Sequence, residues 1–246
     1  MSNRGRTVEE AVILAAGMGS RLPSGEVPKP LVKIGGKRLL QRTIGNLAKA
    51  GIRRAIVVVG FQREELTAAL GDVDVPGMEL EAVVNERWRD PNGLSLYAAK
   101  DAVHGEKFVL TMADHLFDYT IISDLIATGT PEQGVCLAVD ADVESIFDLD
   151  DATKVLVKDG LIRRIGKEIT DYNAIDTGLF LCSRGVFSSL EEAFEGGGES
   201  LSDGMKILGG RDRLACMPVD GRYWQDVDDE AMFGKAEQDI LDGKVS

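Results

Sequence analysis

Short apolar runs alternate with amphipathic segments through the first half of the chain. The runs are rich in β-branched residues, as is typical of strands buried on both faces of a parallel sheet, and they lie at residues 11–14, 55–59, 81–84 and 108–112. Between them, apolar residues recur at helical spacing over residues 38–50, 62–70 and 93–102. This alternation predicts an α/β fold with a Rossmann-like, doubly wound, mostly parallel sheet.

Strand-like segments predominate in the second half. Candidate strands lie at residues 135–139, 153–157, 161–165, 173–182 and 213–219. The second and third of these are joined by Lys158-Asp159-Gly160, and Asp-Gly is a strong hairpin signal. Helices are expected at residues 184–194 and 229–241, with a flexible loop at 195–198.

The two halves show no internal repeat and no linker between them. We therefore expect one domain over residues 1–246. Its parts would be an α/β core at 11–128, a small β-rich part at about 135–222 and a C-terminal helix at 229–242.

The first apolar run leads into small residues and then two cations. The sequence is Leu14-Ala15-Ala16-Gly17-Met18-Gly19-Ser20-Arg21-Leu22, followed by Lys29-Pro30-Leu31. Small residues let backbone N–H groups approach an anion, and glycine lets successive N–H groups turn toward one point. Arg21 can bind phosphate bidentately, and Lys29 adds a compact charge on a long stem. The stretch predicts a polyphosphate site at the end of the first strand.

Two other phosphate loops fit this stretch poorly. A dinucleotide fingerprint needs a third glycine and an immediate helix, but Leu22 and Pro23 stand at that point. A Walker loop needs a G-K-[ST] end, which is absent. An ordinary glycine-rich turn between strand and helix remains the alternative.

Composition and charge restrict the class of protein. The 246 residues are 44% hydrophobic and 28% charged, with no apolar run near the ~18 residues of a membrane span and no signal-peptide core. A cytoplasmic protein without membrane insertion is expected. Three separate cysteines, Cys136, Cys182 and Cys216, lie in apolar runs and read as reduced thiols.

The net charge of −13 disfavours a nucleic-acid partner. The same charge would repel an anionic substrate, so the cleft must be locally positive. A few placed lysines and arginines and a divalent cation would meet this need, since one contact between unit charges at 4 Å is worth about 4 kcal/mol at an effective dielectric of 20.

The motif L-A-A-G-x-G-x-R-L followed by P-K-P-L resembles the signature of nucleotidyltransferases that join a nucleoside triphosphate to a sugar or alcohol phosphate and release pyrophosphate. The resemblance implies that Leu14, Ala15, Ala16, Gly17, Gly19 and Ser20 wrap the nucleotide. It also implies catalytic roles for Arg21 and Lys29, which would neutralise the triphosphate.

Two carboxylates match the metal ligands of that family. Asp114 follows the strand at 108–112, and Asp226 lies in a late W-x-D-V-D sequence. Both would bind Mg²⁺, which prefers hard oxygen ligands. A cap of the following turn remains the alternative for Asp114, and Asp228 is interpreted as the N-cap of the last helix.

The pair Asp114-His115 is similar to that of the cytidylyltransferases that act on inositol 1-phosphate. The resemblance implies transfer of CMP from CTP to inositol 1-phosphate, giving CDP-inositol and pyrophosphate. His115 would contact the acceptor or orient a metal ligand, and both roles remain open. Phosphocholine and sugar 1-phosphates are alternative acceptors. Phosphocholine carries a quaternary ammonium group, which proteins bind with a cage of aromatic side chains. Few aromatic residues beyond Tyr172 and Phe180 lie near the predicted acceptor strand.

The remaining acceptor residues come from the second half. Lys167 resembles the family's substrate-phosphate lysine and is expected to hold the acceptor, with Lys154 as a further cation. A solvated surface position is the alternative for each. Asp176, Thr177 and Gly178 would face the acceptor's hydroxyl groups, because short polar side chains and a missing Cβ suit a polyol.

The resemblance makes residues 11–128 the nucleotide-binding core and about 135–222 the part that covers the site and binds the acceptor. It also implies that the segment with Asn92 and Ser95 lies near the base and the acceptor. Asn92 and Ser95 open a predicted helix and would either cap it or bind the ligand. Gly60, after the strand at 55–59, would let the base pass closely.

Other protein classes remain to be separated from this interpretation. A non-catalytic regulatory subunit would keep the fold and bind a nucleotide, and a dehydrogenase would need the missing third glycine. The resemblance leaves open a homodimer and transfer of the product to a membrane phosphotransferase.

Overall fold

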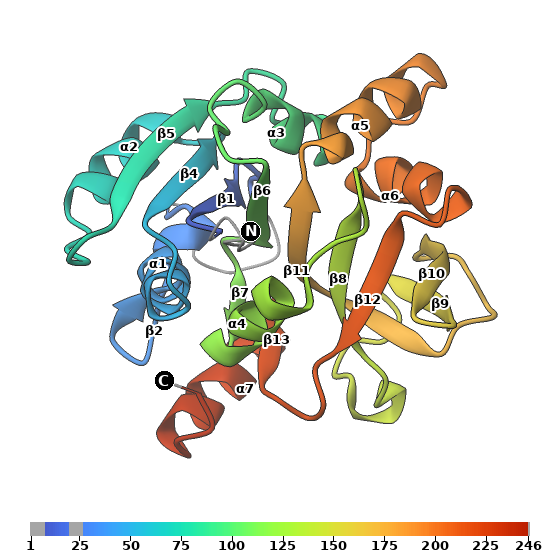
Figure 1. The fold of residues 1–246 in the computed structure, drawn as a ribbon. Helices are drawn as coiled ribbons and strands as arrows, with labels where there is room; N and C mark the ends of the chain where they lie inside the picture. Colours follow the sequence, from blue (N-terminus) through green and yellow to red (C-terminus); the bar gives the residue numbers. More distant parts are fainter. Residues whose placement is uncertain (1–7, 20–26, 246) are drawn as a thin grey trace, which may run out of the picture.

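The computed structural model describes residues 8–19 and 27–245 of the chain. Within these residues the main sheet has nine strands (Figure 1), in the order β5 (Glu79–Val84), β4 (Arg54–Val59), β1 (Glu10–Ala15), β6 (Lys107–Met112), β11 (Ala174–Ser183), β8 (Val135–Asp140), β12 (Leu214–Pro218), β10 (Leu161–Gly166) and β9 (Lys154–Lys158). The first four are parallel. β11 then runs antiparallel to β6 and β8, so the rest of the sheet is mixed. The expected Rossmann-like α/β sheet is confirmed.

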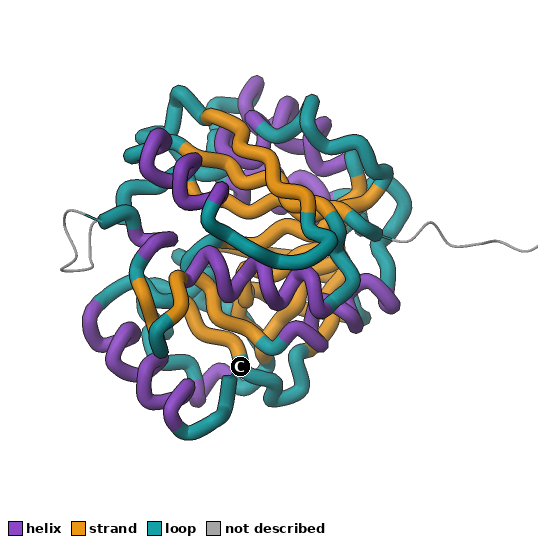
Figure 2. Tube along the Cα trace, turned by 90° about the vertical axis from the view of Figure 1, so that its left-hand side faces the viewer, coloured by secondary structure: helices purple, strands orange, loops and turns teal. Residues whose placement is uncertain are grey.

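Helices cover both faces of the sheet. The helices α1 (Leu39–Lys49), α2 (Arg63–Gly71) and α4 (Tyr119–Thr128) pack into one hydrophobic cluster, and α3 (Gly93–Ala98), α5 (Gly185–Glu195) and α6 (Leu201–Gly210) pack into the other. Successive residues of a strand point to opposite faces, so Ile13 of β1 belongs to the first cluster and Leu14 to the second. Figure 2 shows strands with helices on both sides, which is the doubly wound arrangement.

The β-rich part expected at 135–222 extends the main sheet. Its strands β8 and β12 are parallel to each other, and β10 and β9 form the predicted hairpin at the edge. Neither α4 nor α6 is among the helices predicted from the sequence. The first turn of α6 is fixed by a capping box in which Ser200 and Asp203 bond each other's backbone N–H groups.

A third hydrophobic cluster joins the C-terminal helix α7 (Glu230–Leu241) to two small sheets. One sheet pairs β7 (His115–Phe117) with β13 (Trp224–Asp226), and the other pairs β2 (Lys33–Ile34) with β3 (Lys37–Arg38). Two short 3-10 helices, η1 (Lys29–Leu31) and η2 (Val143–Ser145), lie in connecting segments. The pairing of β7 with β13 brings the late W-x-D-V-D sequence beside the end of β6.

The predicted helix at 93–102 is shorter than expected, because α3 ends at Ala98 and turns follow it. No helix formed by the described residues has both the length and the apolar character that a bilayer span requires.

Candidate active site

Two cavities lie beside the carboxyl ends of β1 and β6, where α/β folds of this kind bind ligands. The smaller has a volume of about 300 Å³ and is called the nucleotide cavity after the ligand expected from the sequence; it is lined by Leu14, Ala15, Gly17, Gly19, Lys29, Pro30, Ala113, Asp114 and Asp228. The larger, called the acceptor cavity after the second expected ligand, has a volume of about 480 Å³, and its wall includes His115, Asp151, Lys167, Asp176, Gly178 and Asp228. The shared Asp228 marks the junction of the two cavities.

The glycine loop lines the nucleotide cavity with four of its predicted residues, Leu14, Ala15, Gly17 and Gly19. Gly19 has a φ of +59°, and a Cβ there would lie 2.6 Å from the Cβ of Lys29, so only glycine fits. Ala16 is buried behind the loop, where its carbonyl accepts the N–H of Phe61. The predicted residues Ser20 and Arg21 lie outside the described residues.

Lys29 is the buried cation at the junction of the cavities. Its side chain is only 7% exposed, and its Nζ lies 2.7 Å from Asp114 Oδ2 and also forms an ion pair with Asp228. Burial alone would lower the pKa of Lys29, but the two carboxylates outweigh it and raise that pKa above its usual value. The ammonium is therefore charged at neutral pH.

Asp114 is ionised in the same cluster. Burial alone would raise the pKa of Asp114, but Lys29 and His115 outweigh this effect and hold the pKa well below its usual value. His115 Nδ1 lies 2.6 Å from Asp114 Oδ1. Both oxygens of Asp114 contact side chains, those of Lys29 and His115, and not a backbone N–H of the following turn, so the described contacts do not support the cap. The ring of His115 also lines the acceptor cavity, so both roles considered for it are compatible with the geometry.

The interpretation of Asp228 as a helix cap is wrong. The N-cap of α7 is Asp229, whose Oδ1 accepts the N–H of Met232 at 2.8 Å. Asp228 instead pairs with Lys29. Of the three late aspartates, Asp226 and Asp228 therefore line a cavity, and Asp229 caps the helix.

Asp226 faces His115 across the β7–β13 pair. Burial, and secondarily the nearby charges of Asp228 and Asp114, raise the pKa of Asp226. Carboxylates that crowd in this way are hard oxygen donors whose repulsion a divalent cation would relieve. Among the described residues no group of three or more His, Cys, Asp and Glu side chains has the spacing of a metal cage. The donor set fits an ion held by two carboxylates and completed by phosphate oxygens and water.

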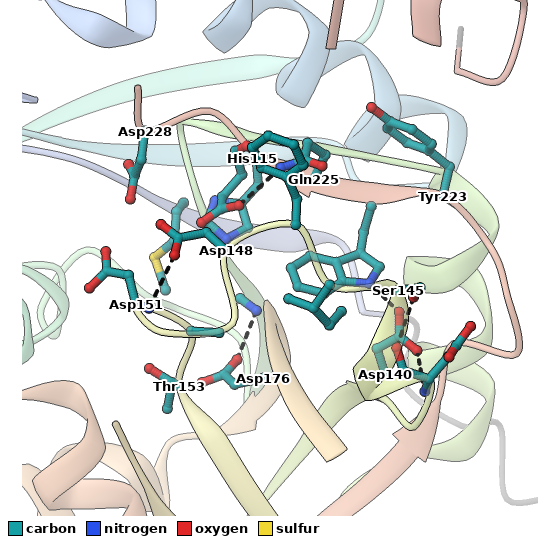
Figure 3. Close-up of a pocket in the computed structure, with 18 of the residues that line it drawn as sticks. His115, Asp140, Ser145, Asp148, Asp151, Thr153, Asp176, Tyr223, Gln225 and Asp228 are labelled. Carbon is teal, nitrogen blue, oxygen red and sulfur yellow. Dashed lines mark hydrogen bonds between the residues drawn. The ribbon is translucent and has the colours of Figure 1, made fainter. Parts of the chain in front are cut away.

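Polar and aromatic side chains line the acceptor cavity (Figure 3). Three aromatic residues, Phe147, Tyr223 and Trp224, belong to its wall, a role that was not predicted for them from the sequence. Trp224 Nε1 donates to Asp140 Oδ2 at 2.7 Å, which fixes the indole beside the end of β8. Tyr172 and Phe180, the aromatics considered from the sequence, are not in this wall, and Phe180 is buried in the core.

Asp176 and Gly178 both line the acceptor cavity as expected residues of β11. Gly178 has a φ of +72°, and a Cβ there would lie 2.4 Å from His115 Nε2. The N–H of Gly178 donates to Asp176 Oδ1 at 2.8 Å. The absence of a Cβ at Gly178 makes room for the ring of His115. Burial raises the pKa of the neighbouring Asp176 to about 6.

Thr177 does not face the acceptor cavity, contrary to the expectation. It is fully buried, and its hydroxyl donates to the carbonyl of Ala138 at 2.8 Å. The pairing of β11 with β8 changes register between Asp176 and Phe180. Because successive side chains of a strand point to opposite faces, Asp176 and Gly178 reach the cavity while Thr177 points away from it and bonds to β8.

The two predicted lysines have different surroundings. Lys167 lines the acceptor cavity, and its half-exposed side chain forms an ion pair with Asp151. Lys154 is buried, and its Nζ donates to the carbonyl of Asp150 at 3.2 Å. Lys154 is not part of either cavity wall, so its contact supports the loop before β9 instead of an acceptor.

Asn92, Ser95 and Gly60 have structural partners. Asn92 lines the acceptor cavity, and its Oδ1 accepts the first N–H of α6, that of Leu201, while it makes no side-chain cap to its own helix. Ser95 is buried and accepts from Asn85 Nδ2 at 3.0 Å. A Cβ on Gly60 would lie 2.3 Å from the Cβ of Trp88. Neither Ser95 nor Gly60 belongs to the two cavity walls built by the described residues, so their predicted contact with the nucleotide is not supported.

Comparison with known proteins identifies the family. Residues 11–206 match the family described as MobA-like NTP transferase domain. The chain belongs to this family. Two relatives are named bifunctional IPC transferase and DIPP synthase. The protein from Aquifex aeolicus is 35% identical over 95% of this chain and 52% of its own length. The protein from Archaeoglobus fulgidus is 34% identical over 96% of this chain and 44% of its own length.

The NTP transferase domain described here thus spans about half the length of these curated relatives. A solved structure of the inositol-1-phosphate CTP transferase from T. maritima superposes with a TM-score of 0.82 and 28% sequence identity, covering 98% of this chain and 99% of that chain. The junction around Lys29, Asp114 and Asp228 is therefore the candidate active site of an NTP transferase domain.

Proposed function

We propose that the chain is a cytidylyltransferase that transfers CMP from CTP to inositol 1-phosphate, giving CDP-inositol and pyrophosphate. The observation that carries this proposal is the junction of two cavities at a buried lysine held by Asp114 and Asp228. The similarity to the inositol-1-phosphate CTP transferase from T. maritima supports the choice of base and acceptor. One cavity suits the triphosphate and the other suits a small polar acceptor.

The acceptor phosphate is the nucleophile. One of its oxygens attacks the α-phosphorus of CTP while the bond from that phosphorus to the bridging β-phosphate oxygen breaks, and pyrophosphate leaves. The attacking oxygen is already an anion, so the reaction needs no general base. The barrier comes from repulsion between anions and from in-line positioning, so catalysis rests on neutralising charge.

Lys29 is the described residue best suited to the leaving pyrophosphate. Its ammonium is charged and buried beside the glycine loop, where electrostatic contacts are stronger than in water. We assign Arg21 to the same phosphates on the resemblance, although it lies outside the described residues. Lys167, in the wall of the other cavity, would hold the acceptor's phosphate.

Asp114 and Asp226 would hold Mg²⁺. The ion would offset the negative charge of the α-phosphate region during transfer. Asp114 is ionised at neutral pH, as a ligand must be. His115 would keep the Asp114 carboxylate oriented through its Nδ1 contact of 2.6 Å.

The Asp176 carboxyl group, with the backbone at Gly178 beside it, would bind the acceptor's hydroxyl groups. Asp176 lines the cavity beside His115 and can accept from a hydroxyl when ionised or donate when protonated. The absent Cβ of Gly178 lets the ring of His115 pack beside this part of the cavity wall.

A phosphorylated amine such as phosphocholine is a second candidate acceptor. Three aromatic residues and several carboxylates line the same cavity, and both features suit a cationic group. The inositol-1-phosphate CTP transferase that superposes over 98% of this chain favours the polyol.

Pyrophosphate release across a matrix of substrates tests the proposal. The matrix combines ATP, CTP, GTP and UTP with inositol 1-phosphate, phosphocholine and glucose 1-phosphate, each with Mg²⁺ and with excess chelator. We expect release with CTP and inositol 1-phosphate, abolished by the chelator and restored by added Mg²⁺. Release with another pair at higher kcat/KM would reassign the substrates, and no release with any pair would favour a regulatory subunit.

A further inference from the structure

The ion pair between Lys167 and Asp151 lies in the wall of the acceptor cavity. The side chain of Lys167 is 52% exposed and that of Asp151 is 35% exposed. In the view of Figure 3, Asp148 and Asp151 lie on the same side of the cavity as Asp228, and Asp140 and Ser145 lie on the other side. A carboxylate of the chain itself therefore holds the lysine that the acceptor's phosphate needs.

We propose that Asp151 is an internal competitor for Lys167 that sets how tightly the active site holds the acceptor and the product. This inference rests on the proposed function, specifically on the assignment of Lys167 to the acceptor's phosphate. A phosphate that binds Lys167 must displace the Asp151 carboxylate or share the ammonium with it.

The strength of the pair suits reversible exchange. Ion pairs that are this exposed contribute little to stability and are weakened further by salt. A phosphate monoester carries a charge of about −1.5 to −2 at pH 7 and has three acceptor oxygens, whereas a carboxylate carries one negative charge. The substrate phosphate is therefore the stronger partner of Lys167.

The balance changes after transfer. The acceptor's phosphate has become part of a diphosphate diester, and the phosphate group that faced Lys167 now carries one negative charge. Asp151 then competes on more equal terms for the lysine. The same carboxylate that weakens acceptor binding would thus help the product to leave.

The backbone on both sides of Asp151 is held in place, so the exchange needs only a change of side-chain partner. On one side, Lys154 Nζ donates to the carbonyl of Asp150 at 3.2 Å. On the other, the N–H of Ala152 donates to the carbonyl of Asp148 at 3.1 Å, and the carbonyl of Thr153 accepts the N–H of Asp176 at 2.9 Å. Asp151 therefore acts at a fixed place in the cavity wall.

Steady-state kinetics of Asp151→Asn test the proposal, with saturating CTP and varied inositol 1-phosphate. An exposed ion pair is worth at most about 1 kcal/mol, so removal of the competitor should lower the acceptor KM by about two- to five-fold. The Ki of CDP-inositol as a product inhibitor should fall by a similar factor. The KM for CTP should stay within two-fold of the wild-type value.

Asp148→Asn is the matched control, because Asp148 lies on the same loop and in the same cavity wall. Calorimetric titration of inositol 1-phosphate should show tighter binding for Asp151→Asn than for Asp148→Asn. In a Lys167→Met background the effect of Asp151→Asn should disappear. An unchanged or raised acceptor KM, or an equal effect without Lys167, would overturn the proposal.

The assay separates this inference from the proposed function. Turnover of CTP and inositol 1-phosphate by the wild-type protein, together with an unchanged KM in Asp151→Asn, would reject only the competitor. Absence of turnover in the wild-type protein would reject the proposed function. The calorimetric comparison would then still decide whether Asp151 opposes binding at Lys167.

Discussion

Lys29 and Asp228 are 199 residues apart in the chain and form an ion pair at the junction of the two cavities. The contact joins the segment after the glycine loop to the segment before α7. Asp114, at the end of β6, holds the same ammonium from another side. Three distant parts of the sequence thus meet at one buried positive charge.

Replacing Lys29 by Ala should remove that charge. Because its ammonium would face the leaving pyrophosphate, we expect kcat to fall by about 10²-fold or more. The loss also leaves two carboxylates without their cation, so the variant should unfold more easily. Lys33→Ala, an exposed neighbour on β2, is the matched control. A folded Lys29→Ala protein, verified by circular dichroism, with near-normal pyrophosphate release would contradict the role.

Asp228 and Asp229 should have separable effects. Asp228→Ala removes one of the two carboxylates that position the Lys29 ammonium. Because misplacement of a catalytic group can lower the rate by about 10²-fold, we expect kcat to fall by at least about ten-fold. Asp229→Ala removes the N-cap of α7 and should lower the free energy of unfolding by about 1 kcal/mol. Urea denaturation and initial rates on both variants check this. Equal kcat values in the two variants would return Asp228 to a structural role.

Asp176 should make stability depend on pH. Burial raises its pKa from 3.8 to about 6, so the folded protein binds this proton more tightly than the unfolded chain does. The stabilisation is complete below pH 3.8 and is lost as pH rises through about 6. Asp176→Asn should therefore raise the free energy of unfolding at pH 7 by about 1–3 kcal/mol relative to wild type, and by much less at pH 4.

Urea denaturation of wild type and Asp176→Asn at both pH values measures this difference. Asp159→Asn, in the exposed β9–β10 turn, is a control for removing one negative charge. The explanation fails if Asp176→Asn changes stability by the same amount at pH 4 and pH 7.

Thr177→Val should affect stability and not substrate binding. The change removes the hydroxyl that donates to the Ala138 carbonyl, and a buried group left unpaired costs about 1–3 kcal/mol. Thr177→Ser keeps the hydroxyl and should lose less stability. Thermal unfolding and the acceptor KM are the measurements. A raised KM in Thr177→Val with unchanged stability would restore the residue to the acceptor site.

The core strands could be predicted from the sequence because they are buried on both faces. The run Ala55 to Val59 is apolar at every position, and the structure makes it the fully buried part of β4. The glycine loop was also recognisable, because Gly19 must accommodate Lys29 at close range. In both cases the local sequence carries the physical requirement.

Other features depend on contacts that are distant in sequence. α6 begins with a recognisable Ser200–Asp203 capping box, but Gly204, Gly209 and Gly210 weaken its helical pattern. Asp228 and Asp229 are adjacent carboxylates, and only the packing of α7 decides which one caps the helix. The pairing of β11 with β6 and β8, which are distant in sequence, decides which face of β11 meets the cavity, and alternation then places Thr177 opposite Asp176 and Gly178.

The central claim is that two phosphates are joined at Lys29, and ³¹P NMR of the reaction mixture tests it most directly. Wild-type protein with CTP, inositol 1-phosphate and Mg²⁺ should convert the two substrates into equal amounts of pyrophosphate and a diphosphate diester. The Lys29→Ala protein should leave both substrates largely unchanged over the same time. Unchanged substrates with the wild-type protein, or CTP hydrolysed without formation of the diester, would contradict the account.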